Sequence, residues 1–347
     1  MMFPGQAKNG SSKRLGSATI LHYSTSWTDP QRPATSSGLQ PTANMSQSAP
    51  ASSLALNRYE IALVIITVFW GATFLIVQKA LAHSDPFVFV GMRFGCAALA
   101  MMLCSLRILR GLTGLEVRAG LLIGLCIFLG YSLQTVGLQT IASSKSAFIT
   151  ALYVPLVPLM QWLFLKRPPS LMNWVGATMA FIGLVLLADP QSMEGGAGTG
   201  EWLTVFSAIA IAVEVILISR FAGQVDLRRV TIVQLATASI LAGLTGVARG
   251  EGVPDLASPV LVISILVLGL ASAVIQITMN WAQNHISATR ATVIYAGEPV
   301  WAGIIGRVFA DERHSALALF GAILIIVSVV VSELKLRVRR RPPAALP

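Results

Sequence analysis

The clearest shortage in this chain of 347 residues is charge, because Asp, Glu, Lys and Arg make up only 12% of it while 54% is apolar. A soluble domain of this length carries about twice that share of charged residues. Its apolar residues would also fall in short amphipathic runs, whereas here they fall in blocks of roughly twenty, the length that crosses a hydrocarbon layer. The scarcity of charge excludes an ordinary soluble domain and predicts an integral membrane protein.

Residues that carry out chemistry are scarce as well. The four histidines show no close pair at metal-ligand spacing, and no glycine-rich loop leads to a phosphate-binding lysine. No convergent set of Ser, His and Asp is visible, and the three cysteines fall inside apolar blocks, where they are interpreted as packing residues. The sequence therefore predicts no metal, no cofactor and no enzymatic reaction.

The apolar blocks are long enough for about ten membrane spans, with short loops between them and no soluble domain. The predicted spans are 59–80, 85–106, 116–139, 146–165, 170–188, 201–221, 228–248, 259–282, 288–310 and 314–334. The predicted fold class is therefore an all-α integral membrane protein with ten transmembrane helices.

The formal net charge of +10 does not predict nucleic-acid binding, because a basic footprint needs a solvated folded surface to carry it. The basic residues cluster instead in loops and tails. If the N-terminus is cytoplasmic, most Lys and Arg residues fall on the cytoplasmic side, as the positive-inside rule requires. Both termini are therefore predicted to be cytoplasmic, in a multi-pass protein of the cytoplasmic (inner) membrane.

The chain also repeats itself. Residues 143–158 line up with residues 287–302 at an offset of 144, which places Pro155 on Pro299. In a membrane chain, such a repeat indicates two halves that face each other around a central path. Five spans per half is an odd number, so the second half is predicted to enter the membrane with inverted topology. The loop charges invert as well, because a basic pair follows the fourth span and an acidic pair follows the ninth.

Four segments follow from this pattern. They are a disordered cytoplasmic tail (1–57), a first five-helix repeat (58–190), a second, inverted five-helix repeat (200–334) and a basic cytoplasmic C-terminal tail (335–347). The first tail is rich in small and polar residues and cannot bury a core. Met45 opens a short polar lead into the first span, and we hypothesise that it is the working start; an ordinary disordered tail is the alternative.

Three charged residues fall in the inner part of a span, where charge is costly and is usually turned toward a cavity or a partner. Arg93 lies in the second span, Glu214 near the middle of the sixth and Glu298 near the middle of the ninth. Each is predicted to bind substrate or to couple its movement to an ion. The alternatives are that Arg93 extends its charge to the interface, or that the carboxylates serve only as structural partners.

The two matched prolines each interrupt a span. Proline inside a helix removes a backbone donor and bends or breaks the helix. Broken helices at matching positions of two halves are a strong sequence indication of a transporter's central site. Pro155 and Pro299 are therefore predicted to act as hinges, although proline kinks also occur in helices that only pack.

Polar stripes run along two spans at helical spacing. In the eighth span Gln276, Asn280 and Gln283 fall on one face, and in the third span a similar stripe ends at Gln139. Within a membrane such a face must look onto protein or a water-filled cavity, so these residues are predicted to line the substrate site. Hydrogen bonds that only hold the bundle together are the alternative.

Aromatic residues supply the last candidates. Trp70 and Tyr153 lie nearer to span centres and are predicted to line the same volume. Tyr295, Trp281 and Trp301 could line this volume too, but aromatics near span ends are more often interface anchors, so Trp70 and Tyr153 are preferred.

At this point the chain resembles the EamA-type members of the drug/metabolite transporter superfamily. The matching features are Trp70-Gly71, Arg93-Phe94, the segment from Gln139 to Pro155, its echo from Gln283 to Glu298-Pro299, and Glu312 before Gly321. The resemblance implies ten helices with cytoplasmic ends, a central cavity shared by the halves, and alternating access for small metabolites, commonly as exporters. The chain departs from the family at Lys166-Arg167, where an acidic residue is frequent, and at Glu214, where relatives are often uncharged.

We therefore predict a secondary transporter of small metabolites in the lipid bilayer, with the halves rocking about the broken fourth and ninth spans. A carboxylate at Glu214 or Glu298 is the candidate for proton coupling, because burial disfavours the charged form. Arg93 is a candidate for holding a substrate carboxylate, which favours an amino acid or organic acid exporter. A nucleotide-sugar-like exchanger and, with less support, a membrane-embedded enzyme are the alternatives, and the oligomeric state is open.

Overall fold

The computed structural model describes residues 56–105, 107–166, 168–187, 198–309 and 315–333. The regular elements in these ranges are all helices, and no strand occurs among them. The predicted tails, and with them the hypothesis about Met45, lie outside the described residues except for the short segment that leads into the first helix. The all-α prediction is therefore confirmed for the part of the chain that the structure describes.

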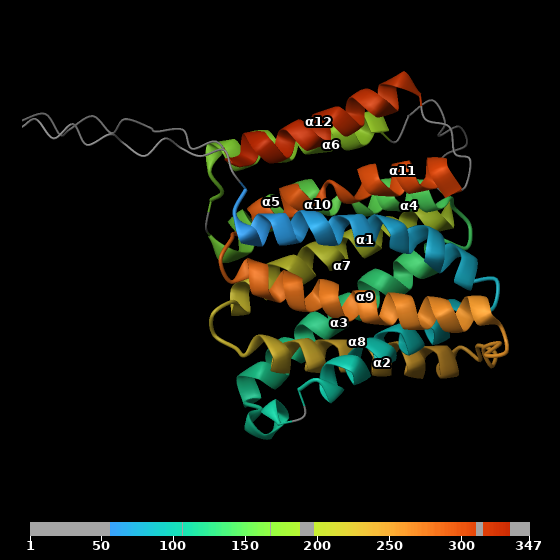
Figure 1. Cartoon of the computed structure of the whole chain (residues 1–347). Coiled ribbons are helices and arrows are strands. Elements are labelled where there is room, and N and C mark those ends of the chain that lie inside the picture. The colour runs from blue at the N-terminus through green and yellow to red at the C-terminus, as the bar shows by residue number, and fades with distance from the viewer. Residues whose placement is uncertain (1–55, 106, 167, 188–197, 310–314, 334–347) are drawn as a thin grey trace, which may run out of the picture. The chain divides into compact units, whose positions relative to one another are not determined.

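The helices follow one another in two sets (Figure 1). The first set is α1 (Arg58–Ala80), α2 (Pro86–Leu103), α3 (Gly114–Gly137), α4 (Ser143–Thr150), α5 (Tyr153–Leu165) and α6 (Leu171–Leu187), with a 3-10 turn, η1 (Ile108–Gly111), before α3. The second set is α7 (Thr199–Phe221), α8 (Leu227–Ala248), α9 (Pro259–Gln283), α10 (Ala288–Tyr295), α11 (Glu298–Phe309) and α12 (Ala316–Glu333).

Seven stretches of the described residues are long and apolar enough to cross a membrane. They are α1, α2, α3, α7, α8, α9 and the stretch Ser143–Phe164, which joins α4 to most of α5. The apolar parts of α6 and α12 are shorter. The predicted ninth span is divided between α10 and α11, each shorter than a full crossing. These helices fit a membrane protein, while the full set of ten spans stays a prediction.

The helix ends follow local rules of sequence. Asn57 caps α1 and Thr113 caps α3, each in a reciprocal box with a glutamate three residues later. Pro86 and Pro259 each occupy the first turn of a helix, where a missing backbone N–H costs nothing. Gly250 follows the end of α8 with a φ of 70°, a conformation that glycine adopts without steric cost.

The interruptions in the fourth and ninth segments lie next to the matched prolines. Pro155 is the third residue of α5 and Pro299 is the second residue of α11, positions at which proline is compatible with a helix. At the first break the carbonyl of Ala151 accepts a hydrogen bond from the backbone N–H of Val154 at 3.0 Å. Each proline therefore begins a new helix, so that each segment consists of two shorter helices.

The two sets pack against each other in matching combinations. Helix α1 lies against α9 and α11, and its counterpart α7 lies against α3 and α5. Likewise α2 packs on α9 while α8 packs on α3, and the pairs α2 with α8 and α6 with α12 complete the arrangement (Figure 1). The core is therefore built mainly from contacts between the two halves.

Contacts at the helix ends fix relative directions. The ring of Tyr59, at the start of α1, stacks on His285, just beyond α9, with centroids 4.0 Å apart. The backbone N–H of Gly223, just beyond α7, donates to the side-chain oxygen of Asn284 at 3.0 Å. The start of α1 and the end of α7 therefore both lie beside the end of α9, which means that these equivalent helices run in opposite directions.

Candidate functional site

The three charged residues singled out in the spans are all buried. Arg93 is 2% exposed, Glu214 is fully buried and Glu298 is 2% exposed. They come from α2, α7 and α11, so that both halves contribute. Buried charge is expensive unless it is hydrogen-bonded or paired, and the surroundings of each residue show how it is accommodated.

Arg93 is held by one hydrogen bond and two aromatic rings. Its Nε donates to the hydroxyl of Ser272 on α9 at 2.9 Å. Its guanidinium lies 5.0 Å from the ring centre of Tyr131 and 5.4 Å from that of Phe94, distances typical of cation–π contacts. Its Nη2 is buried without a hydrogen-bond partner among the described residues, which leaves one end of the planar cation available to a ligand.

Tyr131 is the junction between the charged residues. Its hydroxyl accepts a hydrogen bond from the indole Nε1 of Trp70 on α1 at 3.0 Å. It also lies near enough to interact electrostatically with Glu214, Arg93 and Glu298. One phenol on α3 therefore contacts an indole and a guanidinium and interacts electrostatically with two carboxyl groups.

Glu214 belongs to a chain of buried amides. Its Oε1 accepts from Gln276 Nε2 at 2.9 Å, and the Oε1 of Gln276 accepts from Gln234 Nε2 at 2.8 Å. Asn280 continues the chain, because its Nδ2 lies 3.3 Å from the Oε1 of Gln234 and 3.1 Å from the hydroxyl of Thr231. The Oε2 of Glu214 is buried and has no hydrogen-bond partner in the described part of the chain, so this carboxyl group also keeps one atom for a ligand or a proton.

Glu298 lies at the break between α10 and α11. Its Oε2 accepts a hydrogen bond from the hydroxyl of Tyr153, the first residue of α5, at 3.2 Å. Beside it Tyr295, the last residue of α10, packs edge-on against Trp70 with centroids 5.6 Å apart and accepts a hydrogen bond from Gln283 at 3.4 Å. The two broken segments therefore meet each other at their breaks.

These groups form one polar core, defined here as Trp70, Arg93, Tyr131, Tyr153, Glu214, Ser272, Gln276, Asn280, Gln283, Tyr295 and Glu298. The ion pairs found among the described residues do not join Arg93 to Glu214 or Glu298. A cation and two acidic groups, each with neutral hydrogen-bond partners, can therefore bind a charged ligand without first breaking a salt bridge between themselves.

Most of the candidates taken from the sequence belong to this core. Gln139 does not, because α3 ends at Gly137 and Gln139 is exposed in the turn that follows. The predicted polar stripe extends past the end of its helix, and the role of Gln139 stays a prediction. Gln134, one turn earlier, is buried instead and donates to the hydroxyl of Thr150 at 2.9 Å.

Sequence reasoning undervalued one aromatic residue and missed one amide as a site candidate. Tyr295 was ranked below Trp70 and Tyr153, but it is fully buried against Trp70, because the break after α10 places the end of that helix inside the protein. Gln234 is also fully buried. The signal that could have found it is the repeat, since Gln234 is the counterpart of Arg93 at an offset of 141.

Comparison with known proteins identifies the family. A family model described as the EamA-like transporter family matches residues 57–188 and, a second time, residues 198–334. The chain belongs to the EamA-like transporter family. The double match also shows that the internal duplication seen in the sequence is a duplication of the family's own unit, and it makes the chain a multi-pass membrane transporter.

Relatives of this EamA-like transporter carry similar descriptions. An "Uncharacterized transporter" of Archaeoglobus fulgidus is 28% identical over 276 residues, covering 80% of this chain and 86% of that protein. "Uncharacterized transporter YvbV" of Bacillus subtilis is 22% identical over 294 residues, covering 83% and 95%. "Uncharacterized inner membrane transporter YedA" of Escherichia coli is 24% identical over 278 residues, covering 79% and 90%.

A solved crystal structure shares the fold. It superposes with a TM-score of 0.65 at 17% identity and covers 80% of this chain and 98% of its own. At that identity the likeness shows the fold alone. The arrangement of helices in this chain therefore also occurs in a solved structure.

Proposed function

We propose that this EamA-like transporter moves a small polar metabolite through the polar core by alternating access, most plainly as an exporter in the cytoplasmic membrane. The observation that carries the proposal is the meeting of both halves around Arg93, Glu214 and Glu298, which are buried without forming salt bridges to one another. Buried charges of this kind in a membrane protein mark substrate or ion routes.

The proposed mechanism treats the two halves as inverted repeats, each with five spans, and places both termini in the cytoplasm. The opposite directions of α1 and α7, together with the matching contacts between the halves, support this topology. The breaks beside Pro155 and Pro299 supply the points at which short helices can tilt. Rocking of one group of helices against the other would then expose the core first to one side and then to the other.

The chemistry of the core favours a substrate with a carboxylate and, in one class, an ammonium group. The free Nη2 of Arg93 suits a carboxylate, and the free Oε2 of Glu214 suits a cation. The rings of Trp70 and Tyr131 suit an apolar part of the same molecule. We therefore propose an amino acid or organic acid rather than a nucleotide sugar, because one cation and two acidic groups are poorly matched to a diphosphate.

Proton coupling is proposed at Glu214 or Glu298. Either carboxyl group can carry a proton across the core and release it when the substrate binds or leaves. We expect Glu214→Gln or Glu298→Gln to abolish the dependence of substrate flux on a pH gradient in proteoliposomes. Gradient dependence that persists unchanged in both variants would exclude coupling through these residues.

The first experiment is a flux screen. Purified protein in proteoliposomes is offered radiolabelled amino acids, organic acids and nucleotide sugars, with protein-free liposomes as the control. We expect saturable flux of at least one amino acid or organic acid. Flux of nucleotide sugars only, or no flux above the control across all three classes, would overturn the proposed substrate class.

A further inference from the structure

Two ion pairs outside the polar core join the halves at equivalent positions. Glu60, in the first turn of α1, pairs with Arg290 of α10. Glu201, in the first turn of α7, pairs with Lys145 of α4, with 2.7 Å between Oε1 and Nζ. Glu60 and Glu201 are counterparts at an offset of 141, and Arg290 lies one residue beyond Thr289, which the offset of 144 aligns with Lys145.

The two pairs lie on opposite faces of the helical bundle. Glu60 lies at the start of α1, which shares a face with the end of α7, whereas Glu201 lies at the start of α7. Because α7 has 23 residues and a helix rises about 1.5 Å per residue, its ends are about 34 Å apart. One ion pair therefore stands near each end of the route that a substrate would take.

Each pair also connects the elements that border the core. Trp70 lies ten residues after Glu60 on α1, about 15 Å along the helix axis. Arg290 lies near the start of α10, and Tyr295, the last residue of that helix, packs against the same Trp70. At the other face α4 leads from Lys145 to the break at Tyr153. Separation of either ion pair would thus allow a long helix, α1 or α7, to move away from a broken segment on one side of the core.

We propose that the Glu60–Arg290 and Lys145–Glu201 pairs are two latches, each of which holds one face of the transporter closed and opens when the substrate passes through that face. This inference rests on the alternating access proposed above. The basic side chains Arg290 and Lys145 are 29% and 33% exposed, whereas the side chains of Glu60 and Glu201 are 1% and 14% exposed. Water therefore reaches each pair from its basic side, where it can solvate the cation when the pair separates during a transport cycle.

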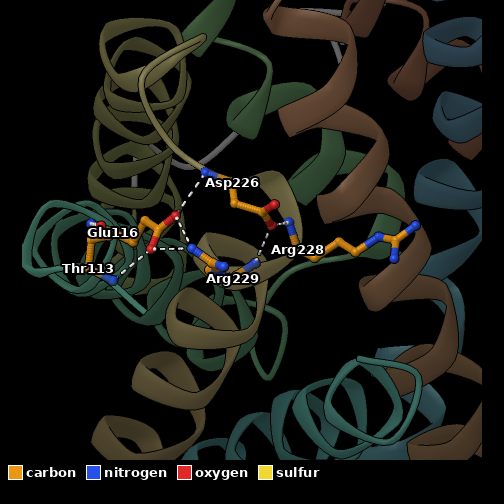
Figure 2. A network of polar contacts seen from close by, with 5 residues as sticks. All are labelled: Thr113, Glu116, Asp226, Arg228 and Arg229. Atoms are coloured by element: carbon orange, nitrogen blue, oxygen red, sulfur yellow. Dashed lines mark hydrogen bonds and ion pairs between the residues drawn. The ribbon is translucent and has the colours of Figure 1, made fainter. Parts of the chain in front are cut away.

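Two other carboxylates join the halves in a different way and serve as matched controls. Glu116 accepts a hydrogen bond from the backbone N–H of Asp226 at 3.1 Å and pairs with Arg229 at 3.3 Å (Figure 2). Glu251 accepts from two backbone N–H groups in the first turn of α2, at 3.2 and 2.8 Å. These bonds cap the N-terminal ends of α8 and α2, away from the broken segments. We therefore expect them to stay formed in both open states.

The test measures access to the core from each face. Ser272→Cys, placed in a chain whose three natural cysteines are changed to Ala, reports access through its labelling rate with a membrane-impermeant maleimide. Right-side-out and inside-out vesicles present the two faces separately. Glu60→Gln keeps the reciprocal helix cap, since glutamine also serves there, but loses the charge; Glu201→Gln removes the charge of the other latch.

We expect Glu60→Gln to raise labelling about two- to fivefold from one face and Glu201→Gln to raise it by a similar factor from the opposite face, because loss of a weak ion pair shifts a two-state equilibrium by that much. The controls are Glu116→Gln and Glu251→Gln, since Glu116 lies on the face of Glu60 and Glu251 on the face of Glu201. Neither control should change the labelling rate from either face. Increases from the same face, or equal increases in the two controls, would overturn the latches.

A double variant that exchanges the two charges of a latch distinguishes loss of the ion pair from unfolding of the protein. Lys145→Glu should open its face, and adding Glu201→Lys should restore the original labelling rate; failure of the double variant to restore it, in protein that elutes as a single folded species, contradicts the proposal. Labelling needs no substrate, so its outcomes distinguish failure of the latches from failure of alternating access. A reporter reached from one face only in every variant refutes alternating access itself, whereas a wild type reached from both faces with no effect of either latch refutes the latches.

Discussion

At the scale of single residues, the polar core depends on the shape of its groups as much as on their charge. Arg93 is the clearest case, because its planar cation lies over two aromatic rings while Nε donates to Ser272. A lysine would keep the charge but could not make the same stacked and hydrogen-bonded arrangement.

We therefore expect Arg93→Lys to lower substrate flux by roughly tenfold, the effect of losing about 1.4 kcal/mol of binding, with little change in the amount of folded protein. Flux in proteoliposomes checks this. Arg249→Lys is the matched control, because Arg249 also lies over a ring, that of Phe87 at 5.5 Å, but is exposed at the end of α8. Equal losses in the two variants would show that Arg93 has no special place in the core.

The hydrogen bond between Tyr153 and Glu298 gives a stability prediction. Tyr153→Phe leaves the Oε2 of Glu298 buried without its donor, and we expect a loss of about 1–3 kcal/mol, the cost of an unsatisfied buried group. Thermal unfolding in detergent measures it. Tyr59→Phe, which removes a hydroxyl that accepts an exposed bond from Arg58, should cost about 0.5 kcal/mol or less. A Tyr153→Phe protein as stable as the wild type would contradict the contact.

At the scale of elements, the close approach of α1 to α11 depends on Gly71. A Cβ at this position would lie 2.8 Å from both the Cβ of Trp301 and the backbone nitrogen of Ala302. Backbone atoms cannot move aside cheaply, so we expect Gly71→Ala to destabilise the protein by about 1–3 kcal/mol.

The matched substitution is Gly243→Ala in α8, where an added Cβ meets nothing within 4 Å. Alanine in an open helical position is neutral or stabilising by up to about 1 kcal/mol. Thermal unfolding of both variants in the same detergent makes the comparison. Destabilisation of the same size at both positions would mean that the two helices are not in close contact at Gly71.

The sequence predicted elements better than it predicted their ends. The apolar blocks and the matched prolines indicated where helices run and where two of them break, because hydropathy and the missing proline N–H act locally. The end of α3 was misplaced, and with it Gln139, because the stripe of polar residues continues beyond Gly137 while the helix does not. The burial of Tyr295 depends on the path that the broken ninth segment takes through the protein, and no local sequence pattern predicts that path.

Pairs of residues far apart in the chain were out of reach for the same reason. Glu60 and Arg290 are each ordinary charged residues near helix ends, and only the packing of α1 against α10 brings them together. The amide chain from Glu214 through Gln276 to Gln234 likewise joins three helices. Proximity of residues on different helices is a property of the assembled fold, so these contacts follow from the structure and not from spacing.

At the scale of the whole molecule, a symmetric framework carries an asymmetric core. Glu298 has Val154 as its counterpart at the offset of 144, and it accepts a hydrogen bond from Tyr153, whose own counterpart is Gly297. Arg93 likewise has Gln234 as its counterpart. In the proposed mechanism the duplicated framework supports two open states of similar energy, and the residues that differ between the halves supply the binding chemistry.

Counterflow in proteoliposomes tests most directly whether the halves alternate around this core. Vesicles are loaded with an unlabelled substrate from the flux screen and diluted into a trace of the labelled form. We expect internal substrate to accelerate uptake and to produce a transient accumulation of label above its equilibrium level, because one site faces the two sides in turn. Uptake that is indifferent to internal substrate, with no transient accumulation, would indicate an open pore and contradict alternating access.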